Sequence, residues 1–334
     1  MMFDVFGLGN ALVDMEFRVD DSFLQRQSIP KGHMTLVDEA RLDALIGDLD
    51  GLRPEQLSGG SAANTIIAVQ AFGARTFYTC KVADDPTGNY FLKDMAAAGV
   101  TINTNAQAAS GKSGHCLVLI TPDAERSMNT FLGISSELST GDIDTEALAR
   151  SRYFYVEGYL SSSPGSCAAA TLAREIAEAE GVKTALSLSD PSMVEFCRDG
   201  LIQILGNGVD HLFCNAEEAL TWAGTDRLDI AVKELSDISR NLNVTLGSRG
   251  CLVVNARTRH TLTGYPTQAV DTTGAGDMYA GACLYGWSVG MSSEQAAAFG
   301  NYAAARLVAH YGARLRTLPE YPETLKAFSS LTPG

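Results

Sequence analysis

The chain has 334 residues, 46% of them hydrophobic, which is enough apolar material for one large α/β domain or two ordinary ones. Its formal net charge of -14 at pH 7, with no basic block, argues against nucleic acid as a partner, since the chain would repel a polyanion. No apolar stretch approaches the roughly 20 residues of a membrane helix, no secretion signal precedes the first apolar run, and the seven cysteines are scattered singly. We therefore expect no membrane association and a location in the reducing cytoplasm.

Short β-rich runs alternate with longer helical ones along the chain, which predicts an α/β fold with a mainly parallel sheet. Glycines mark the ends of two predicted helices, Ser61–Phe72 before Gly73 and residues 90–98 before Gly99, since a left-handed residue commonly ends a helix. A further helix is predicted over residues 293–311. Strands are predicted at residues 5–8, 76–82, 153–157, 184–188, 211–214 and 244–246.

Two segments break this alternation, residues 15–37 and residues 107–133. Both mix polar and apolar residues without a helical period, which predicts short strands. Together they would form a small sheet over the main domain, and the role expected of such a sheet is an active-site lid. The alternative is two long loops without that role.

Asp14 follows the first predicted strand, at the start of the first lid segment. A carboxylate there would accept two hydrogen bonds from a diol of a ribose or sugar, which is a strong charge-assisted pairing. The alternative is a solvated turn residue. The nearby Gly7-x-Gly9 also fits the start of a dinucleotide-binding turn, but Leu12 stands where the third glycine of that motif belongs, so an oxidoreductase is the weakest interpretation.

A glycine pair, Gly59-Gly60, stands directly before the helix predicted from Ser61. Paired glycines let the backbone approach a polyhydroxylated ligand closely, because no Cβ intervenes. Asn64, one turn into the helix, offers both a donor and an acceptor to vicinal hydroxyls. Taken alone, the same residues also fit an ordinary helix start.

Polar residues follow two further strands. Asn215 and Glu218 come after the strand at residues 211–214, at a carboxyl end where open α/β sheets bind ligands. An Asn cap with acids in the first helical turn fits them equally well. Thr245, Gly247 and Gly250 form a strand end and a glycine turn that would present polar groups to a nucleotide, although a plain hairpin has the same pattern.

The most informative stretch is Asp-Thr-Thr-Gly-Ala-Gly-Asp at residues 271–277. Gly274 and Gly276 leave room for backbone N–H groups to approach a ligand, and the start of a helix just after them would bind phosphate oxygens. A carboxylate beside a phosphate site is electrostatically unfavourable, which suggests a function. The function expected for Asp277 is to accept the proton of an attacking hydroxyl. The alternative is an ordinary helix cap.

The two glycine motifs have the order and separation of the two signatures of the ribokinase-like (PfkB) carbohydrate and nucleoside kinases, and the chain resembles that family over nearly its whole length. The resemblance implies a three-layer α/β fold with a mainly parallel central sheet flanked by helices, plus a small β lid. It implies one kinase domain over residues 1–330, with the lid segments inserted in it. It also implies ATP and Mg²⁺, and in some relatives a monovalent cation near the loop after Asp271.

The resemblance assigns roles to residues of this chain. Asp277 would be the general base, beside an anion hole formed by Gly274, Ala275 and Gly276. Glu218 would hold Mg²⁺ through water, which suits an ion that keeps most of its water ligands. Substrate binding falls to Asn10, Asp14, Gly59, Gly60 and Asn64, and ATP binding to Asn215, Thr245, Gly247, Gly250, Gly274, Gly276 and Asn301.

Within the family, the N-terminal third is most similar to the adenosine kinases, in Gly9-Asn10-x-Leu12-x-Asp14 and in the length of the first lid segment. Tyr159 is similar in position to an aromatic that stacks on the substrate base, although most aromatics only pack. Arg126 resembles a lid arginine that meets the transferred phosphoryl group, and its alternative is a hairpin-tip arginine in water.

These resemblances imply an alcohol-accepting phosphotransferase that moves the γ-phosphoryl group of ATP to the 5′-hydroxyl of adenosine, as in purine salvage. A ribokinase-like or fructokinase-like sugar kinase is the first alternative. A non-catalytic nucleoside-binding protein is an alternative of another class, but a binder has no use for the base Asp277. The expected partners are small molecules, and the chain is expected to be a monomer or a homodimer.

Overall fold

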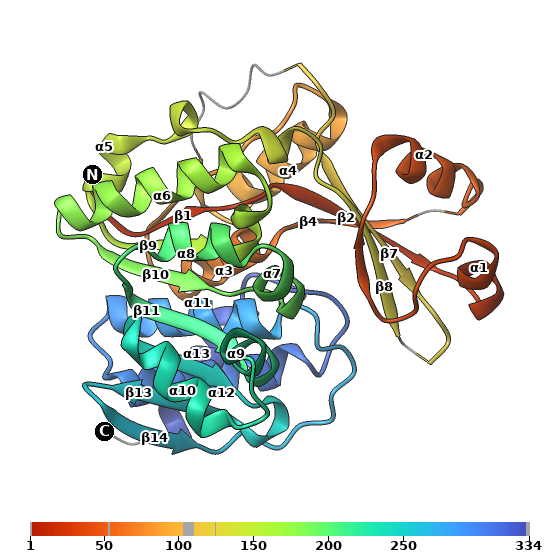
Figure 1. Ribbon diagram of the computed structural model, residues 1–334. Coiled ribbons are helices and arrows are strands. Elements are labelled where there is room, and N and C mark those ends of the chain that lie inside the picture. Colours follow the sequence, from red (N-terminus) through yellow and green to blue (C-terminus); the bar gives the residue numbers. More distant parts are fainter. Residues whose placement is uncertain (1, 53, 103–109, 124, 332–334) are drawn as a thin grey trace.

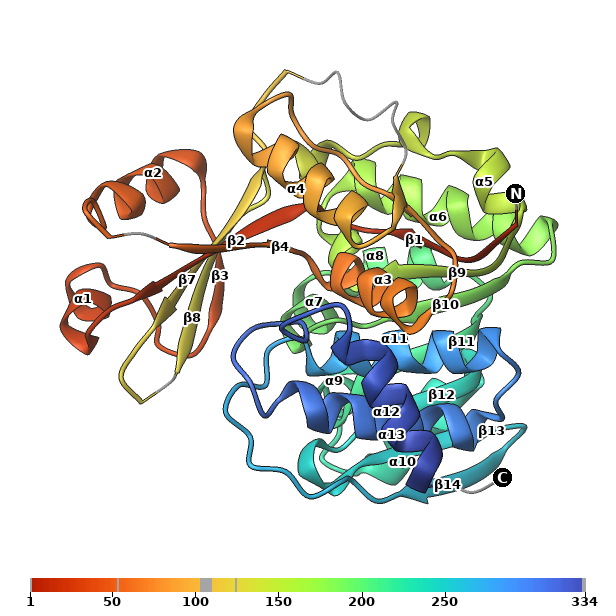
Figure 2. The same cartoon turned by 180° about the vertical axis from the view of Figure 1, so that it is seen from behind.

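The computed structural model describes residues 2–52, 54–102, 110–123 and 125–331, and within these ranges it contains a large and a small sheet (Figures 1 and 2). The large sheet has the strand order β14-β13-β12-β11-β10-β9-β1-β5-β6, and only β13 and β14 run antiparallel to their neighbours. Its strands are β1 (Phe3–Leu8), β5 (Thr76–Thr79), β6 (Thr101–Ile102), β9 (Ser151–Glu157), β10 (Lys183–Ser187), β11 (Val209–Asn215), β12 (Ser239–Thr245), β13 (Cys251–Asn255) and β14 (Thr258–Leu262).

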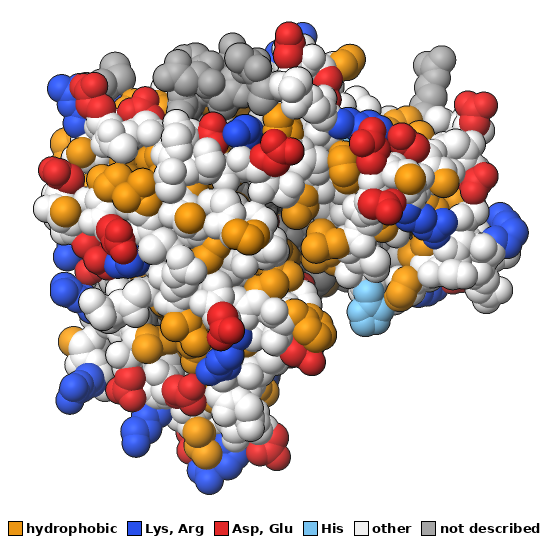
Figure 3. Space-filling view, turned by 45° about the horizontal axis from the view of Figure 1, so that its top comes forward, with side chains coloured by type: hydrophobic (Ala, Val, Ile, Leu, Met, Phe, Trp, Pro, Cys, Tyr) orange, Lys and Arg blue, Asp and Glu red, His pale blue; other side chains and the backbone are white. Residues whose placement is uncertain are grey.

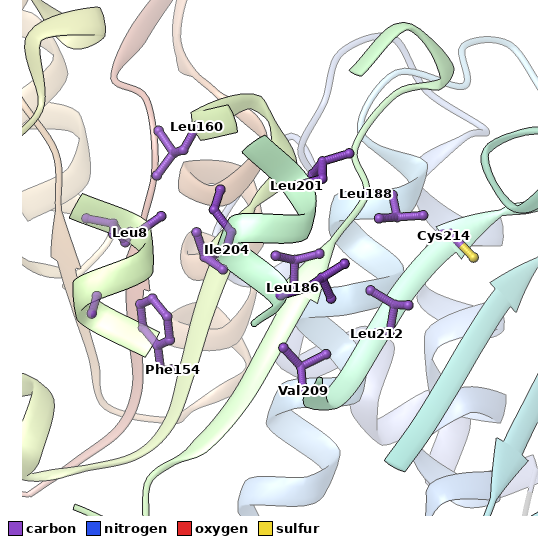
Figure 4. Packing of buried hydrophobic residues seen from close by; sticks show 14 of the residues in the cluster. Leu8, Phe154, Leu160, Leu186, Leu188, Leu201, Ile204, Val209, Leu212 and Cys214 are labelled. Carbon is purple, nitrogen blue, oxygen red and sulfur yellow. The ribbon is translucent and has the colours of Figure 1, made fainter. Parts of the chain in front are cut away.

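Alternate residues of the large sheet face two different helical layers, because successive side chains of a strand point to opposite faces. Phe154 and Val156 of β9 enter one core, whereas Tyr155 between them enters the other. Figure 4 shows strand residues of the first core packed against Leu201 and Ile204 of α8. This layer contains α5 (Thr145–Ala149), α6 (Pro164–Ala179), α7 (Pro191–Phe196), α8 (Arg198–Leu205), α9 (Ala216–Ala223) and α10 (Leu228–Asp237).

The second layer carries the two glycine motifs on adjacent helices. It contains α3 (Ser61–Phe72), α4 (Pro86–Ala97), α11 (Ala275–Ser288) and α12 (Ser293–Leu307), with α13 (Glu320–Leu331) packed outside them. The three-layer arrangement predicted for the central sheet and its helices is therefore confirmed. Short 3-10 helices connect several elements, at Gly133–Glu137, Thr140–Asp142, Gly158–Ser162 and Gly247–Arg249.

The small sheet stands to one side of the large one and has the order β3-β8-β7-β2-β4 (Figure 1). Leu117 and Leu119 of β7 pack under two short helices, while Cys116 and Val118 face the opposite way. The elements are β2 (Leu12–Arg18), α1 (Asp21–Arg26), β3 (Met34–Leu36), α2 (Glu39–Gly47), β4 (Glu55–Gly59), β7 (Gly114–Ile120) and β8 (Arg126–Phe131).

Strands from both predicted lid segments lie in this sheet, but the prediction of short strands alone over residues 15–37 is wrong for α1. Six residues are too few to show a helical period, and the side chain of Asp20 caps the helix by accepting from Phe23 N. The sheet also includes β4, outside the predicted segments. Residues 107–109 and 124 of the second segment lie outside the described residues. That the sheet is a lid on a single domain stays a prediction.

Strands lie at all six predicted positions, and the helix Ser61–Phe72 is confirmed, with Gly73 left-handed at φ 117°. The bounds differ at β5, which ends at Thr79 instead of residue 82, at β12, which begins at Ser239 instead of residue 244, and at α4, which begins at Pro86 instead of residue 90. The helix over residues 293–311 ends early, at Leu307, because the carbonyl of Val308 accepts from the backbone N–H groups of Val270 and Asp271 instead of continuing the helix. Across the described ranges, no helix is both long and apolar enough to cross a membrane.

Candidate active site

A cleft of about 780 Å³ lies between the carboxyl ends of the central parallel strands and the small sheet. In Figure 3 the small-sheet lobe stands apart from the main body, and the surface is indented where the two meet. Residues from both glycine motifs, from the ends of β9, β11 and β12, and from the exposed face of the small sheet line the cleft. It is therefore the place where residues far apart in sequence meet.

Asp277 stands in the first turn of α11, on the side of the cleft formed by the Asp-Thr-Thr-Gly-Ala-Gly-Asp motif. Gly274 caps this helix at φ 73°, and a Cβ there would lie 2.5 Å from the carbonyl oxygen of Ala313. A Cβ on Gly276 would meet nothing within 4 Å, so this position is open toward the cleft. The backbone N–H of Ala275 donates to the carbonyl oxygen of Thr272 at 3.2 Å, whereas the next two N–H groups of the first turn, at Gly276 and Asp277, need no partner within the helix, which suits them to an anion.

The carboxylate of Asp277 contacts the first turn of α3. Ser61 Oγ donates to its Oδ1 at 2.6 Å, and Asn64 Nδ2 donates to its Oδ2 at 3.3 Å. Burial raises the pKa of Asp277 to about 6, while the two hydrogen bonds lower it. A carboxylate with this pKa is ionised at neutral pH and is more basic than an exposed aspartate, which suits a general base.

Asn64 has spare hydrogen-bonding capacity at the same place. Its side chain is buried and lines the cleft, and its Oδ1 has no hydrogen-bond partner among the described residues. Because a buried acceptor without a partner is costly, this atom is suited to a donor supplied by a ligand hydroxyl. Gly60 brings the neighbouring backbone close, since a Cβ on it would lie 2.6 Å from the carbonyl oxygen of Asn10.

Glu157, at the end of β9, is a completely buried carboxylate that sequence reasoning missed as a site residue. Its Oε1 accepts from the backbone N and from Nδ2 of Asn10, both at 2.8 Å, and its Oε2 accepts from Ala62 N at 2.7 Å. Burial raises its pKa to about 7, against the effect of these donors. Glu157 therefore joins the Asn10 loop to the start of α3.

Asp14 lies on β2, where it borders the cleft. Burial raises the pKa of Asp14 to about 7, and the guanidinium of Arg314 opposes that rise. Gly59 of β4 is its close neighbour, since a Cβ on Gly59 would lie 2.3 Å from Asp14 Oδ1. Gly59 does not line the cleft itself, but it makes room for the carboxylate that does.

Arg126 lines the cleft but is already paired in this arrangement. Its Nη1 donates to Asp271 Oδ2 at 2.6 Å, and its Nη2 donates to Glu16 Oε1. Asp271 also accepts from the backbone N–H groups of Gly312 and Thr273, at 2.7 and 3.0 Å. Arg126 thus joins the small sheet to the first residue of the Asp-Thr-Thr-Gly-Ala-Gly-Asp motif. Its guanidinium is the cation that contacts Asp271.

Asn215 and Glu218 line the cleft at the end of β11, and they satisfy each other. Glu218 N donates to Asn215 Oδ1 at 2.8 Å, and Asn215 Nδ2 donates to Glu218 Oε1 at 2.6 Å. Burial raises the pKa of Glu218 to about 7. Asn215 and Glu218 therefore form the helix cap that was the alternative to ligand binding, and both residues of this cap also line the cleft.

The remaining predicted residues divide into two groups. Thr245, Gly247 and Tyr159 line the cleft. Gly250 and Asn301 do not: Gly250 packs against the backbone of Leu262, and Asn301 Nδ2 donates to the carbonyl oxygens of Leu262 and Thr263, at 3.5 and 3.4 Å. The latter two therefore support the turn after β14 and do not face the space that a ligand would occupy.

The small sheet contributes an apolar wall to the cleft, and Asp14, Glu16 and Arg126 of the same sheet line the cleft beside it. Cys116 sits in this wall and accepts a hydrogen bond from Thr130 Oγ1 at 3.4 Å. Burial raises the pKa of the Cys116 thiol, so it is a neutral packing group. The apolar wall consists of Leu12, Met34, Leu36, Cys116, Val118 and Met128.

Three site residues that the sequence did not single out differ in their sequence signal. Ser61 lies inside the first glycine motif, so its position was visible although its contact with Asp277 was not. Glu157 ends a predicted strand, where a polar residue after an apolar run is a usable signal. Arg314, which pairs with Asp94 at 3.0 Å and donates to Ser58 Oγ at 3.0 Å, has no local motif.

Comparison with known families finds one that covers most of the chain. The model for the "pfkB family carbohydrate kinase" matches residues 45–320. The match includes both glycine motifs and the strands whose ends line the cleft. No groups of three or more His, Cys, Asp or Glu residues that could hold a metal ion occur among the described residues.

Proteins similar to this chain are named either as adenosine kinases or as sugar kinases. The crystal structure of adenosine kinase from Sinorhizobium meliloti has a TM-score of 0.90 and 36% identity, covering 98% of this chain and 99% of that chain. The structure of a probable sugar kinase from Rhizobium etli has a TM-score of 0.91 and 32% identity, covering 99% and 100%. Adenosine kinase of Saccharomyces cerevisiae is 28% identical over 344 residues, covering 96% of this chain and 98% of that protein.

Proposed function

The chain belongs to the pfkB family of carbohydrate kinases, and on that premise we propose that it transfers the γ-phosphoryl group of ATP to the 5′-hydroxyl of adenosine. Family membership makes it a phosphotransferase with an alcohol acceptor. The choice of a nucleoside as the acceptor is supported by similarity to adenosine kinases and by the lining of the cleft.

The observation that most supports the choice of a nucleoside is that the cleft offers both polar groups and an apolar surface. Asp14, Asn64 and Asp277 offer polar groups to hydroxyls, and the apolar wall of the small sheet lies next to Asp14, whose neighbours on that sheet are Leu12 in β2 and Cys116 in β7. A nucleoside has the matching division, because its ribose is hydroxylated and its base presents large flat faces. A free sugar has hydroxyl groups over most of its surface and would leave the apolar wall without a partner.

The reaction requires one proton acceptor and several anion donors. The 5′-oxygen of the acceptor forms a bond to the γ-phosphorus while the bond from that phosphorus to the β,γ-bridging oxygen breaks. The proton of the hydroxyl goes to Asp277, and ADP leaves with the electron pair. First-turn N–H groups of α11, at Gly276 and Asp277, hold the negative charge of the phosphoryl oxygens, joined by that of Ala275 once it has left the carbonyl oxygen of Thr272.

The nucleotide is assigned to the part of the cleft beside α11 and the end of β12. Thr245 and Gly247 face it there, and the open Gly276 lets phosphate oxygens reach the backbone. Glu218 and Asp190 also line this space, and oxygen ligands held at a distance through water fit Mg²⁺. When bound, Mg²⁺ would neutralise phosphate charge.

Arg126 is proposed to act on the phosphoryl group only after its ion pairs have exchanged, since both ends of its guanidinium are taken. Tyr159 is proposed to contact the base from the side of the central sheet. We expect the reaction to occur in the cytoplasm, because the seven cysteines are all free thiols.

A sugar kinase of the same family is the second candidate, and the similarity to the probable sugar kinase of Rhizobium etli favours it. The two candidates differ in a panel of acceptors. Purified protein with ATP and Mg²⁺ would be tested on adenosine, inosine, cytidine, ribose and fructose, by measuring ADP formation and the phosphorylated product.

Adenosine is expected to give the highest kcat/KM, by at least about tenfold over ribose, because the wall adds apolar burial for the base. Strong turnover of a free sugar without turnover of adenosine would overturn the proposal. Adenosine binding without ADP formation would indicate the non-catalytic binding protein instead.

A further inference from the structure

The hydroxyl of Ser61 has a single partner among the described residues. It donates to Oδ1 of Asp277 at 2.6 Å, and it does not cap its own helix, whose N-cap is Gly60 without a side-chain hydrogen bond. The two residues are 216 positions apart. A short bond to one oxygen of a carboxylate restricts the rotation of that carboxylate, since the two oxygens can no longer exchange places.

The two oxygens of Asp277 are therefore not equivalent. Oδ1 is held at 2.6 Å by a hydroxyl, whereas Oδ2 has only Asn64 Nδ2 at 3.3 Å. The longer contact is the weaker one. Both Asn64 and Asp277 line the cleft, and Asn64 Oδ1 has no hydrogen-bond partner among the described residues, so Oδ2 of Asp277 and Oδ1 of Asn64 are the oxygens of this pair with capacity left for a ligand hydroxyl.

The distance between Ser61 and Asp277 is set one turn further along both helices. A Cβ on Gly281 of α11 would lie 2.8 Å from the carbonyl oxygen of Thr65 and 2.8 Å from the Cβ of Ala68, both on α3. Thr65 is four residues after Ser61, and Gly281 is four residues after Asp277. The backbone of α11 therefore packs against the backbone of α3 one helical turn after the hydrogen bond between Ser61 and Asp277.

We propose that Ser61 is a positioning residue for Asp277, which holds Oδ1 so that Oδ2 accepts the proton of the acceptor hydroxyl. The inference rests on the proposed function for its catalytic meaning. Ser61 does not receive the proton in this scheme, because its own hydroxyl hydrogen already points at Oδ1. Removal of the hydroxyl would let the carboxylate rotate and would take away a donor that stabilises its charged form.

The test compares Ser61→Ala with Ser61→Thr, which keeps a hydroxyl, and with Ser151→Ala as a matched control. Ser151 is buried at the start of β9, its Oγ donates to the backbone oxygen of Ala147 at 2.8 Å, and it does not line the cleft. Initial rates with ATP and the best acceptor would be measured from pH 5 to 9, giving kcat and KM for both substrates.

Ser61→Ala is expected to lower kcat by about tenfold to a hundredfold, as for other losses of alignment, with both KM values within about twofold. The acid limb of kcat is expected to move to higher pH, because the lost donor favoured the ionised carboxylate. Ser61→Thr should restore most of the rate, and Ser151→Ala should leave the rate and its pH dependence unchanged.

Two other outcomes would overturn the proposal. A higher KM for the acceptor with an unchanged kcat and an unchanged acid limb would make Ser61 a substrate contact. If Ser61→Ala kept wild-type kinetics, the hydrogen bond to Asp277 would have no role in positioning the carboxylate. Other titrating groups near Asp277 are Asp14 and Glu157, and the neighbouring Tyr78, Tyr155 and Tyr159 have raised pKa values and stay neutral over this range.

A measurement without substrate separates this inference from the proposed function. Carboxyl-labelled aspartate would report the titration of Asp277 by ¹³C NMR, with Asp277→Asn to assign its signal. The titration midpoint is expected to rise in Ser61→Ala and to return in Ser61→Thr, and an unchanged midpoint would overturn the inference. If the wild-type protein phosphorylates no acceptor, the proposed function fails, while this titration still decides whether Ser61 holds Asp277.

Discussion

The carbonyl oxygen of Thr65 lies 2.8 Å from the place that a Cβ on Gly281 would occupy. The two helices that carry the glycine motifs therefore meet at backbone distance, one turn below the pair formed by Ser61 and Asp277. No side chain larger than hydrogen fits at position 281 without moving one helix. The catalytic carboxylate proposed for this chain thus depends on a glycine that does not line the cleft.

Gly281→Ala is expected to separate α3 from α11, because the new methyl group would overlap Thr65 and Ala68. The cost in the free energy of unfolding should be about 1–3 kcal/mol, and kcat should fall together with it. Gly47→Ala is the matched control, since a Cβ there meets nothing within 4 Å, and it should be neutral or slightly stabilising. Chemical denaturation and steady-state rates check both, and equal effects of the two changes would contradict the packing argument.

Asp277→Asn is expected to lower kcat by about a hundredfold to ten-thousandfold, because an amide cannot accept the proton of the acceptor hydroxyl. Substrate binding should change little, since Asn can still contact Ser61 and Asn64. The exposed Asp226→Asn serves as a control for the loss of one negative charge. Rates and substrate affinities would be measured side by side, and near-normal phosphorylation by Asp277→Asn would remove the base assignment.

Asp14→Asn is expected to stabilise the protein in a pH-dependent way. Burial raises the pKa of Asp14 from 3.8 to about 7, so the folded protein holds this proton more tightly than the unfolded chain does. The stabilisation from this proton is complete below about pH 4 and is lost as the pH rises through about 7. The melting temperature of Asp14→Asn should therefore exceed that of the wild type more at pH 8 than at pH 5.

The same variant is expected to bind the acceptor more weakly, because the charged acceptor of diol hydrogen bonds is gone. A stability gain that is equal at both pH values would show that the carboxyl group of Asp14 does not titrate as stated.

Glu157→Gln is expected to raise the KM of the acceptor at least about tenfold, with little change in the KM of ATP. The amide can still accept from Asn10, but its NH₂ group opposes the N–H of Ala62, so the start of α3 loses its acceptor. Because burial raises the pKa of Glu157 to about 7, the wild type itself becomes neutral at this position as the pH falls. The difference between wild type and variant should therefore shrink below about pH 7, and a pH series of KM values checks it.

Arg126→Gln is expected to destabilise the fold by about 3 kcal/mol, because it leaves the buried carboxylate of Asp271 and the partly buried one of Glu16 without their cation. Glu16→Gln added to this variant should recover part of the loss, since one of the two charges is then removed. Urea unfolding of the three proteins measures the effect. Wild-type stability of Arg126→Gln would show that the ion pairs contribute nothing in solution.

Local spacing was enough to predict most of the central fold. Alternation of short apolar runs with capped helices located the strands and indicated a mainly parallel sheet, because strand and helix formation depend on neighbours within a few residues. The three-layer arrangement was implied by the family resemblance. The helix at residues 293–311 was predicted too long, because its end depends on the contact between Val308 and the loop at Val270, which no local pattern encodes. The small sheet was only partly foreseen, since α1 is too short for a period.

The sequence by itself determined which chemical groups stand next to one another along the chain: a carboxylate after a glycine turn, and an amide one turn into a helix. It could do so because turn and cap geometry act over a few residues. Only the tertiary structure decided which oxygen of Asp277 accepts from Ser61 and that Arg126 is paired with Asp271. It also decided that Glu157 accepts a hydrogen bond from Asn10, which is 147 positions away. These contacts depend on how closely helices and sheets approach, which is set by packing across the whole core and by single glycines such as Gly281.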